Sequence, residues 1–178
     1  LLVALGCVHG ISGFSSTQIT AFYLATYLPM TFIAFLFLSL VRAQGVGEDL
    51  VSLGGLGRNN TWLGLCVTIA LASLAGLPLT AGFMGKWMVI FSAAYDGSYW
   101  ALAFAILGAA TGFYYYFKVI LAIYQDSSDA ERIKIKISPL SQALLAVLTL
   151  SILVIGVYPK SVRQLLDSKP KAAVSMTR

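Results

Sequence analysis

The stretch ASLAGLPLTAGFMGKWMVI, residues 72–90, decides the fold of this chain. It lies inside a mostly apolar run, Trp62–Ala94, which as one straight α-helix would be about 50 Å long against a hydrocarbon core of about 30 Å. Gly76 and Pro78 mark the place where such a helix breaks, because proline removes a backbone donor and clashes with the preceding turn, while glycine permits unusual dihedral angles. The sequence therefore predicts two half-helices, at 62–75 and 81–94, joined by an unwound stretch at 76–80.

The composition is that of a membrane protein. Hydrophobic residues make up 58% of the 178 residues and charged residues only 11%, with a mean hydropathy of +0.84, whereas a soluble domain has about 25% charged residues. The net charge is +5, but the basic residues form no block with interleaved aromatic residues, so they are expected to anchor helix ends at lipid headgroups. We predict an integral, multi-pass membrane protein that contacts the lipid bilayer and binds no nucleic acid.

Further apolar runs complete a predicted all-α fold, a polytopic transmembrane helix bundle with one discontinuous, proline-broken helix. The predicted segments are a half-helix at 1–12, spans at about 19–41, 62–94 (broken at 76–80), 99–124 and 139–158, and a tail at 161–178. The first run is too short to cross a core of about 30 Å, so it is interpreted as the second half of a truncated helix. Lysines and arginines divide evenly between the loops predicted on one side of the membrane and the tail predicted on the other, so the charge distribution does not determine how the chain is oriented in the membrane.

Lys86 is the charged residue whose position calls for a functional explanation. It lies about 12 Å from the end of its half-helix, where a lysine costs about 2.5–3.5 kcal/mol on insertion scales. Burial favours the neutral amine and a nearby carboxylate favours the charged form, so a lysine between these influences can load and release a proton as its partner moves. No carboxylate lies inside a predicted span, which places the partner outside this chain. The alternative is a structural role, as a static buried pair or a cavity-lining residue.

The break at Gly76 and Pro78 supports the functional interpretation. Unwound backbone at membrane depth is tolerated only where it is buried in protein or lines water, and discontinuous helices recur at the ion sites of transporters. An ordinary proline kink is the alternative. Lys118 lies about 9 Å from the end of its span, so it is either a residue that reaches the headgroups or part of a hydrated proton path. The tyrosines at 114–116 cannot all line one cavity, because consecutive residues point around a helix.

The remaining reactive residues give no metal or cofactor site. Cys7 and Cys66 each stand alone in apolar sequence, and His9 is the only histidine. No disulfide, zinc or iron–sulfur pattern is present, and His9 is interpreted as an interfacial residue. Thr68, Ser73, Thr80 and Thr111 are candidate hydrogen-bonding groups between helices, or to water. The prediction is a chain that holds neither a cofactor nor a metal.

The segment LASLAGLPLTAGFMGKWMVI (residues 71–90) resembles the broken-helix motif of the antiporter-like subunits of respiratory complex I, the proton-pumping NADH:quinone oxidoreductase. The family pattern, approximately L-A-G-[IL]-P-x-[TF]-x-G-F-x-[GS]-K, is matched throughout by residues 74–86. ATGFYYYFKVILAIY (110–124) resembles the following helix of the N-type subunit, called subunit 2 in mitochondria, and AFYLATYLPMTFIAFLFLSLV (21–41) resembles the preceding one. The M-type subunit commonly carries glutamate at the position of Lys86, which favours the N-type.

This resemblance implies that residues 1–178 are the C-terminal part of one transmembrane proton-translocation domain. Lys86 would be the proton relay on the broken helix, and Gly76 and Pro78 would make the break. The chain would be a non-redox translocase subunit that contacts other membrane-arm subunits. NAD, FMN, iron–sulfur clusters and quinone would be bound elsewhere in the complex.

The implied location is a bacterial plasma membrane, with organellar inner and thylakoid membranes as alternatives. Two other functions remain open. One is a subunit of a monovalent cation/proton antiporter or of a membrane-bound hydrogenase. The other is a structural membrane scaffold in which Lys86 forms a static pair.

Overall fold

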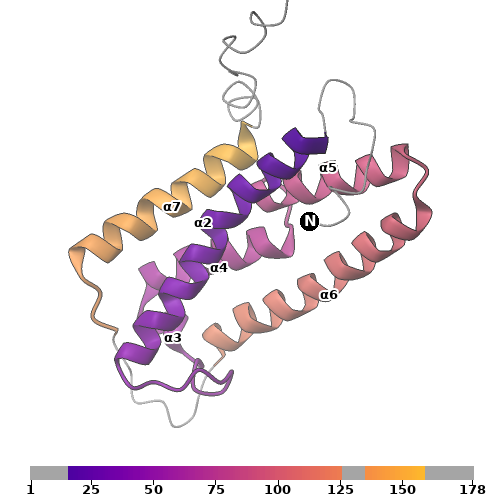
Figure 1. Cartoon of the computed structure of the whole chain (residues 1–178). Coiled ribbons are helices and arrows are strands. Elements are labelled where there is room, and N and C mark those ends of the chain that lie inside the picture. The colour runs from indigo at the N-terminus through magenta and orange to yellow at the C-terminus, as the bar shows by residue number, and fades with distance from the viewer. Residues whose placement is uncertain (1–15, 126–134, 159–178) are drawn as a thin grey trace, which may run out of the picture.

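The computed structural model describes residues 16–125 and 135–158 (Figure 1). The predicted half-helix at 1–12, with Cys7 and His9, and the predicted tail at 161–178 lie outside the described residues. Within them the fold is a helix bundle without strands, as the sequence predicts. Its elements are α2 (Ser16–Ala43), α3 (Leu56–Asn59), α4 (Thr61–Ala75), α5 (Ala81–Tyr95), α6 (Tyr99–Tyr124) and α7 (Pro139–Val157).

Among the described residues, three helices are long and apolar enough to cross a membrane: α2 from Gln18, α6 and α7. Helices α4 and α5 have 15 residues each, which gives each a length of about 22 Å, too short to cross a core of about 30 Å alone. They follow one another in sequence with only residues 76–80 between them. The discontinuous helix of the predicted fold is therefore present, and α4 and α5 begin and end within one residue of the predicted half-helices.

Helix α4 lies at the centre of the described bundle. It contacts α2, α5, α6 and α7, and its buried side chains include Leu63, Val67 and Ala70. Helices α6 and α7 lie on opposite sides of the group formed by α2, α4 and α5 (Figure 1). The two half-helices are thus positioned by three spanning helices around them.

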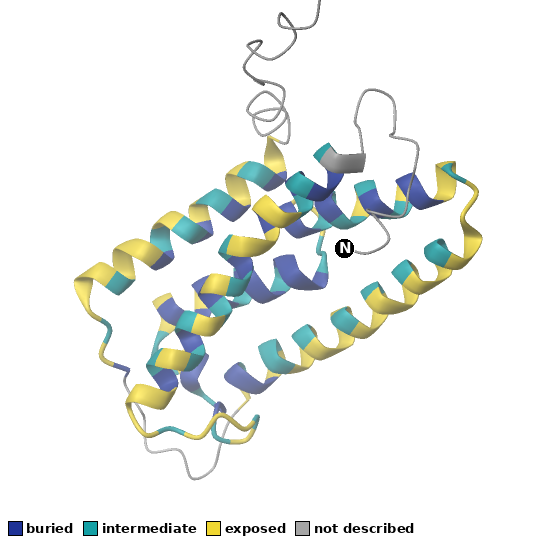
Figure 2. Cartoon of the chain, in the orientation of Figure 1, coloured by how far each residue is buried: buried dark blue, intermediate teal, exposed yellow. Residues whose placement is uncertain are grey.

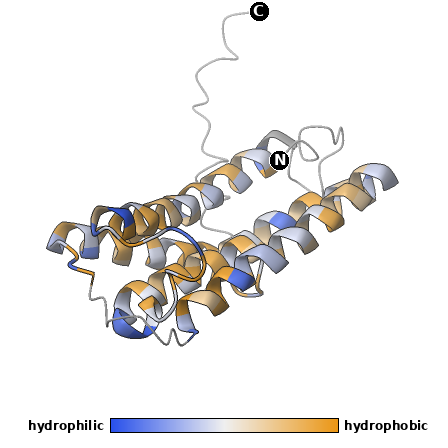
Figure 3. Ribbon diagram, turned by 90° about the horizontal axis from the view of Figure 1, so that it is seen from below, coloured by the Kyte–Doolittle hydropathy of each residue, from blue (hydrophilic) through white to orange (hydrophobic). Residues whose placement is uncertain are grey.

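The outer surface is apolar, as expected where helices meet lipid or further membrane helices. Figure 3 shows hydrophobic residues along all of the long helices, and many large hydrophobic side chains on them are exposed. Helix α6 is the most exposed element, since only Ala122 and Ile123 among its residues are buried (Figure 2). Trp100 and Phe104 on the same helix are 82% and 69% exposed.

Helix α7 packs directly against the backbone of the break. A Cβ atom placed on Gly156 would lie 2.7 Å from the backbone nitrogen of Ala81 and 2.7 Å from the carbonyl carbon of Thr80, which is closer than real Cβ contacts allow. Residue 156 must therefore be glycine for α7 to support the segment between α4 and α5 at this distance.

Replacing Gly156 by alanine tests this contact. The added methyl group must displace backbone of the break or of α7, and we expect a loss of about 1–3 kcal/mol in the free energy of unfolding. The matched control is Gly108→Ala in α6, where a Cβ would meet no atom within 4 Å. Thermal unfolding of the intact protein in detergent measures both variants, and equal stability of the two would contradict the contact.

Candidate functional site

Helix α4 ends in a glycine that adopts a left-handed conformation. Gly76 has φ = 91°, and its backbone N–H lies 3.0 Å from the carbonyl oxygens of Ala72 and Ser73. The N–H of Leu77 also donates to Ala72, at 3.0 Å. A glycine in this conformation closes many helices because it has no Cβ to strain. The chain direction changes here, and two carbonyl groups of the last turn, those of Leu74 and Ala75, remain to be satisfied.

Lys86 satisfies these two carbonyl groups. In a continuous helix, the carbonyl of Leu74 would accept a hydrogen bond from the residue four positions later, which is Pro78 and has no N–H. The Nζ atom of Lys86 donates instead, to the oxygen of Leu74 at 2.7 Å and to that of Ala75 at 2.9 Å. The ammonium group thus lies at the C-terminal, negative end of the α4 dipole, where a cation is stabilised.

Ser73 provides the reciprocal contact from α4 to α5. Its buried hydroxyl oxygen accepts a hydrogen bond from the backbone N–H of Gly82 at 3.0 Å. Gly82 is in the first turn of α5, whose N–H groups have no partner within the helix. Thr80 occupies the N-cap position but does not cap α5, since its hydroxyl donates to the carbonyl of Leu77 at 2.6 Å. Each half-helix therefore caps the other through one side chain, an arrangement we call the cross-cap (Lys86 with Leu74 and Ala75, Ser73 with Gly82).

The cross-cap depends on close approach of α4 and α5. A Cβ atom on Gly82 would overlap the carbonyl oxygen of Ser73, and one on Gly76 would lie 3.1 Å from Cδ of Lys86. The lysine side chain therefore runs along the bare backbone of Gly76 to reach the carbonyls. Between the two helices, Leu79 has φ = 70° and is 75% exposed. A leucine with positive φ is uncommon, and it shows that the segment is held in an unwound conformation.

A cavity of about 230 Å³ adjoins the cross-cap. It is lined by Ser73 and Leu74 of α4 and by Gly82 and Lys86 of α5, and the other lining residues come from α2 and α6. Tyr27 of α2 and Gly108 of α6 are both exposed within the described residues, so in this part of the chain the cavity opens between these two helices. Lys86 is half-buried within the described residues, so the burial that the sequence predicts for it is not confirmed.

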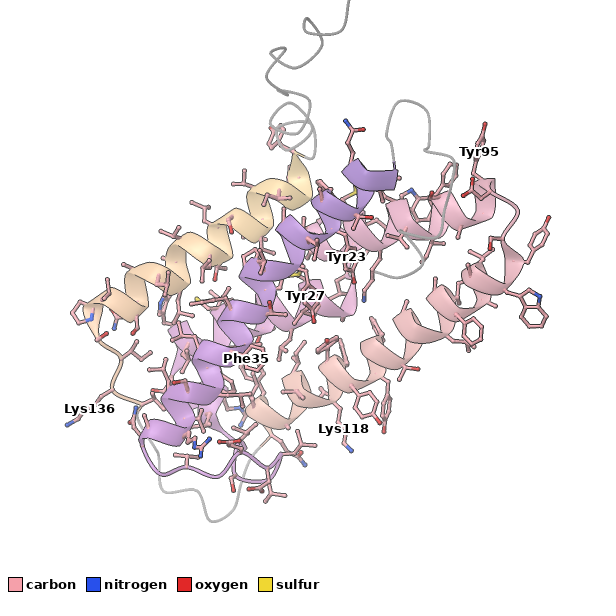
Figure 4. All side chains as sticks on the ribbon, viewed as in Figure 1. Tyr23, Tyr27, Phe35, Tyr95, Lys118 and Lys136 are labelled. Carbon is pink, nitrogen blue, oxygen red and sulfur yellow. The ribbon has the colours of Figure 1, made fainter. Side chains whose placement is uncertain are left out.

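The sequence-predicted site residues divide into two groups. Gly76, Pro78 and Lys86 belong to one local structure, the break. Lys118 does not line the cavity, but lies on the exposed face of α6 and points away from the other helices (Figure 4). Its place in a proton path stays a prediction.

The acidic residues of the described part of the chain lie away from the break. Glu48, Asp49 and Asp96 are the acidic residues of the described part of the chain, and all three lie outside the helices. Glu48 forms an exposed ion pair with Arg42 at 3.7 Å. Hydrogen bonds from Ser52 keep the pKa of the Asp49 carboxyl below its usual value. Residues 16–125 and 135–158 contain no group of three or more His, Cys, Asp or Glu that could hold a metal ion.

Comparison with known proteins gives the family. Residues 1–112 match the family described as NADH:quinone oxidoreductase/Mrp antiporter, TM. The chain is 33% identical over 151 residues to NADH-quinone oxidoreductase subunit N 2 of Syntrophobacter fumaroxidans, covering 85% of this chain and 32% of the relative. It is 35% identical over 146 residues to subunit N of Methylococcus capsulatus, covering 81% and 29%.

A solved structure agrees with these relatives. A chain of respiratory complex I from Thermus thermophilus, determined with bound aureothin, aligns with a TM-score of 0.69 and 32% identity, covering 82% of this chain and 33% of that one. The present chain thus spans about a third of the length of the proteins it matches.

The apolar spanning helices and the family match define an integral membrane helix bundle. The chain belongs to the family of transmembrane subunits shared by NADH:quinone oxidoreductase and Mrp antiporters. Within that family it is similar to the N-type, antiporter-like subunits of complex I, which confirms the resemblance found in the sequence.

Replacing Ser73 by alanine tests the half of the cross-cap that the sequence did not assign. The change leaves the buried N–H of Gly82 without its acceptor, so we expect a loss of about 1–3 kcal/mol in the free energy of unfolding. Ser151→Ala is the matched control, because the Ser151 hydroxyl bonds only to a carbonyl of its own helix, that of Leu148 at 2.7 Å. Thermal unfolding of the intact protein compares the two, and an equally small effect at both positions would refute the capping role of Ser73.

Proposed function

We propose that this chain is part of a proton-translocating membrane-arm subunit of an NADH:quinone oxidoreductase, and that Lys86 is its proton relay. The observation that carries the proposal is the position of the Lys86 ammonium group. It bonds to two carbonyl groups at a break between half-helices and faces a cavity of about 230 Å³. Gly76 and Pro78 create the break that makes this position possible.

The surroundings of the break act on the protonation state of the Lys86 amine in two opposite ways. The carbonyls of Leu74 and Ala75 and the negative end of the α4 dipole favour the protonated amine. Partial removal from water favours the neutral amine. A carboxylate that approaches the cavity would further stabilise the protonated amine and so drive proton uptake at Nζ. Its withdrawal would remove that stabilisation and drive proton release. A neutral amine keeps two N–H donors, which allows the contact to the carbonyls to survive deprotonation.

The remaining parts of the proposal follow the relatives. Both relatives named above are subunits N of NADH-quinone oxidoreductase from bacteria, which favours the oxidoreductase over a cation/proton antiporter. We therefore propose that this subunit contacts other membrane-arm subunits and lies in a bacterial plasma membrane. It would hold no redox cofactor, with NAD, FMN, iron–sulfur clusters and quinone bound by other subunits, and would act as the non-redox translocase part of the enzyme.

Replacing Lys86 by arginine tests the proton relay. Arginine keeps the positive charge and can donate to both carbonyls, but it does not release its proton in proteins. We expect the Lys86→Arg complex to assemble, with proton translocation slowed on the order of 10²-fold. The measurement is the rate of proton translocation during quinone reduction by the intact complex in proteoliposomes.

Replacing Lys86 by methionine separates the relay from a scaffold role. Methionine removes both the proton and the donors, so Lys86→Met should lose translocation and also unfold at a lower temperature than Lys86→Arg, because two carbonyls lose their partner. If Lys86 only stabilised the fold, the Lys86→Arg complex would translocate protons at the wild-type rate. That result would contradict the proposal.

The second lysine is tested in the same assay. Lys118 lies on the exposed face of α6, and as a headgroup contact its loss would leave translocation unchanged. Because Lys118 points away from the other helices, we expect Lys118→Met to translocate at the wild-type rate, and slowed translocation at unchanged thermal stability would place Lys118 in the path. Wild-type translocation by this variant would remove Lys118 from the path and leave the role of Lys86 untouched.

A further inference from the structure

Three tyrosines from two helices face Lys86 across the cavity. Tyr23 and Tyr27 lie one turn apart on α2, with their rings stacked at 6.1 Å between centroids and an interplanar angle of 13°. Tyr116 reaches the same cavity from α6. All three tyrosines therefore line the same cavity as Lys86. In Figure 4, Tyr23 and Tyr27 lie on the side of α2 that faces α6.

Tyr23 is held beside the lysine by the packing of α2 on α5. A Cβ atom on Gly85, the residue before Lys86, would lie 3.1 Å from Cδ2 of Tyr23 and 3.4 Å from Oγ1 of Thr26. Glycine at position 85 therefore allows the Tyr23 ring to lie directly on α5. Tyr27 is one turn farther along α2 and is 39% exposed, so the pair extends from the vicinity of Lys86 to the open side of the cavity.

The structure also distinguishes among the consecutive tyrosines of α6. Tyr114 and Tyr115 are each 62% exposed and do not line the cavity. Tyr116 is half-buried and does. Tyr124, near the end of the helix, has its hydroxyl 3.1 Å from Oγ1 of Thr68 and lies outside the cavity. One tyrosine of this helix is thus placed opposite Lys86, and its neighbours in sequence serve as natural controls.

We propose that the hydroxyl groups of Tyr23, Tyr27 and Tyr116 form a relay that carries protons between Lys86 and the open side of the cavity. This inference rests on the proposed role of Lys86 as a proton carrier. A phenol hydroxyl both donates and accepts hydrogen bonds, and a cavity of about 230 Å³ has room for water between the groups.

The proton count of each step balances. The ammonium group of Lys86 gives one proton to a cavity water, and each hydroxyl then accepts one proton from the preceding water and releases its own to the next. The tyrosines end the sequence neutral, as they began it, and one proton leaves the cavity on the side between α2 and α6. For net translocation, the proton that recharges Lys86 must reach Nζ by a route other than this one.

Phenylalanine substitutions test the relay, because each removes one oxygen and keeps the ring. In the intact complex in proteoliposomes, we expect the triple variant Tyr23→Phe/Tyr27→Phe/Tyr116→Phe to slow proton translocation on the order of 10²-fold, and each single variant to slow it less, since the remaining hydroxyls and water can substitute. The double variant Tyr114→Phe/Tyr115→Phe, on the exposed face of the same helix, should translocate at the wild-type rate.

The ratio of translocation rates in H₂O and D₂O provides a readout that a packing role would not change. Loss of relay hydroxyls should alter this ratio in the single variants, and the exposed-face control should keep the wild-type ratio. If the triple variant fails to assemble, the double variant Tyr27→Phe/Tyr116→Phe takes its place. Its translocation rate and its ratio of rates in H₂O and D₂O are then compared with those of the exposed-face control.

The outcomes separate this inference from the function on which it rests. Wild-type rates and isotope ratios in the cavity variants, together with lost translocation in Lys86→Arg, would overturn the tyrosine relay and leave the role of Lys86 standing. Wild-type translocation by Lys86→Arg would overturn both. Slowed translocation in the cavity variants and in Lys86→Arg, with a normal exposed-face control, is the result that supports the relay.

Discussion

The contact between the Lys86 ammonium group and the carbonyls of Leu74 and Ala75 is the interaction on which the rest of the site depends. Pro78 cannot donate to Leu74, so the helix cannot continue and a donor must come from elsewhere. Lys86 supplies it at 2.7 Å and 2.9 Å, while Ser73 supplies an acceptor to the start of α5. A break that would otherwise expose unpaired backbone within a membrane is thereby closed by two side chains.

The same contact joins stability to function. A group that only capped a helix would need hydrogen-bond donors but no removable proton, and arginine would serve well. Lysine combines the capping geometry with a proton that can leave, beside a cavity lined by hydroxyl groups. Gly82 and Gly156 let α4, α5 and α7 hold the break at contact distance, so packed helices position the lysine beside the cavity.

Much of the fold could be predicted from the sequence, because length and hydropathy constrain membrane helices strongly. The run from Trp62 to Ala94 is too long for one span, and glycine and proline indicate where it breaks. The site was predictable only in part. The function of Ser73 depends on a contact with Gly82, and the selection of Tyr116 over Tyr114 and Tyr115 depends on which face of α6 meets the cavity. The degree of burial of Lys86 is equally hard to predict, because hydropathy along the chain does not reveal which side of a helix its neighbours cover.

The most direct test of the account is the number of protons translocated per quinone reduced by the intact complex carrying Lys86→Arg. This variant keeps the charge and the donors of the cross-cap and removes only the ability to release a proton. The account predicts an assembled complex with a proton-to-quinone ratio below that of the wild type. A wild-type ratio would contradict it, because the lysine would then act only as a helix cap.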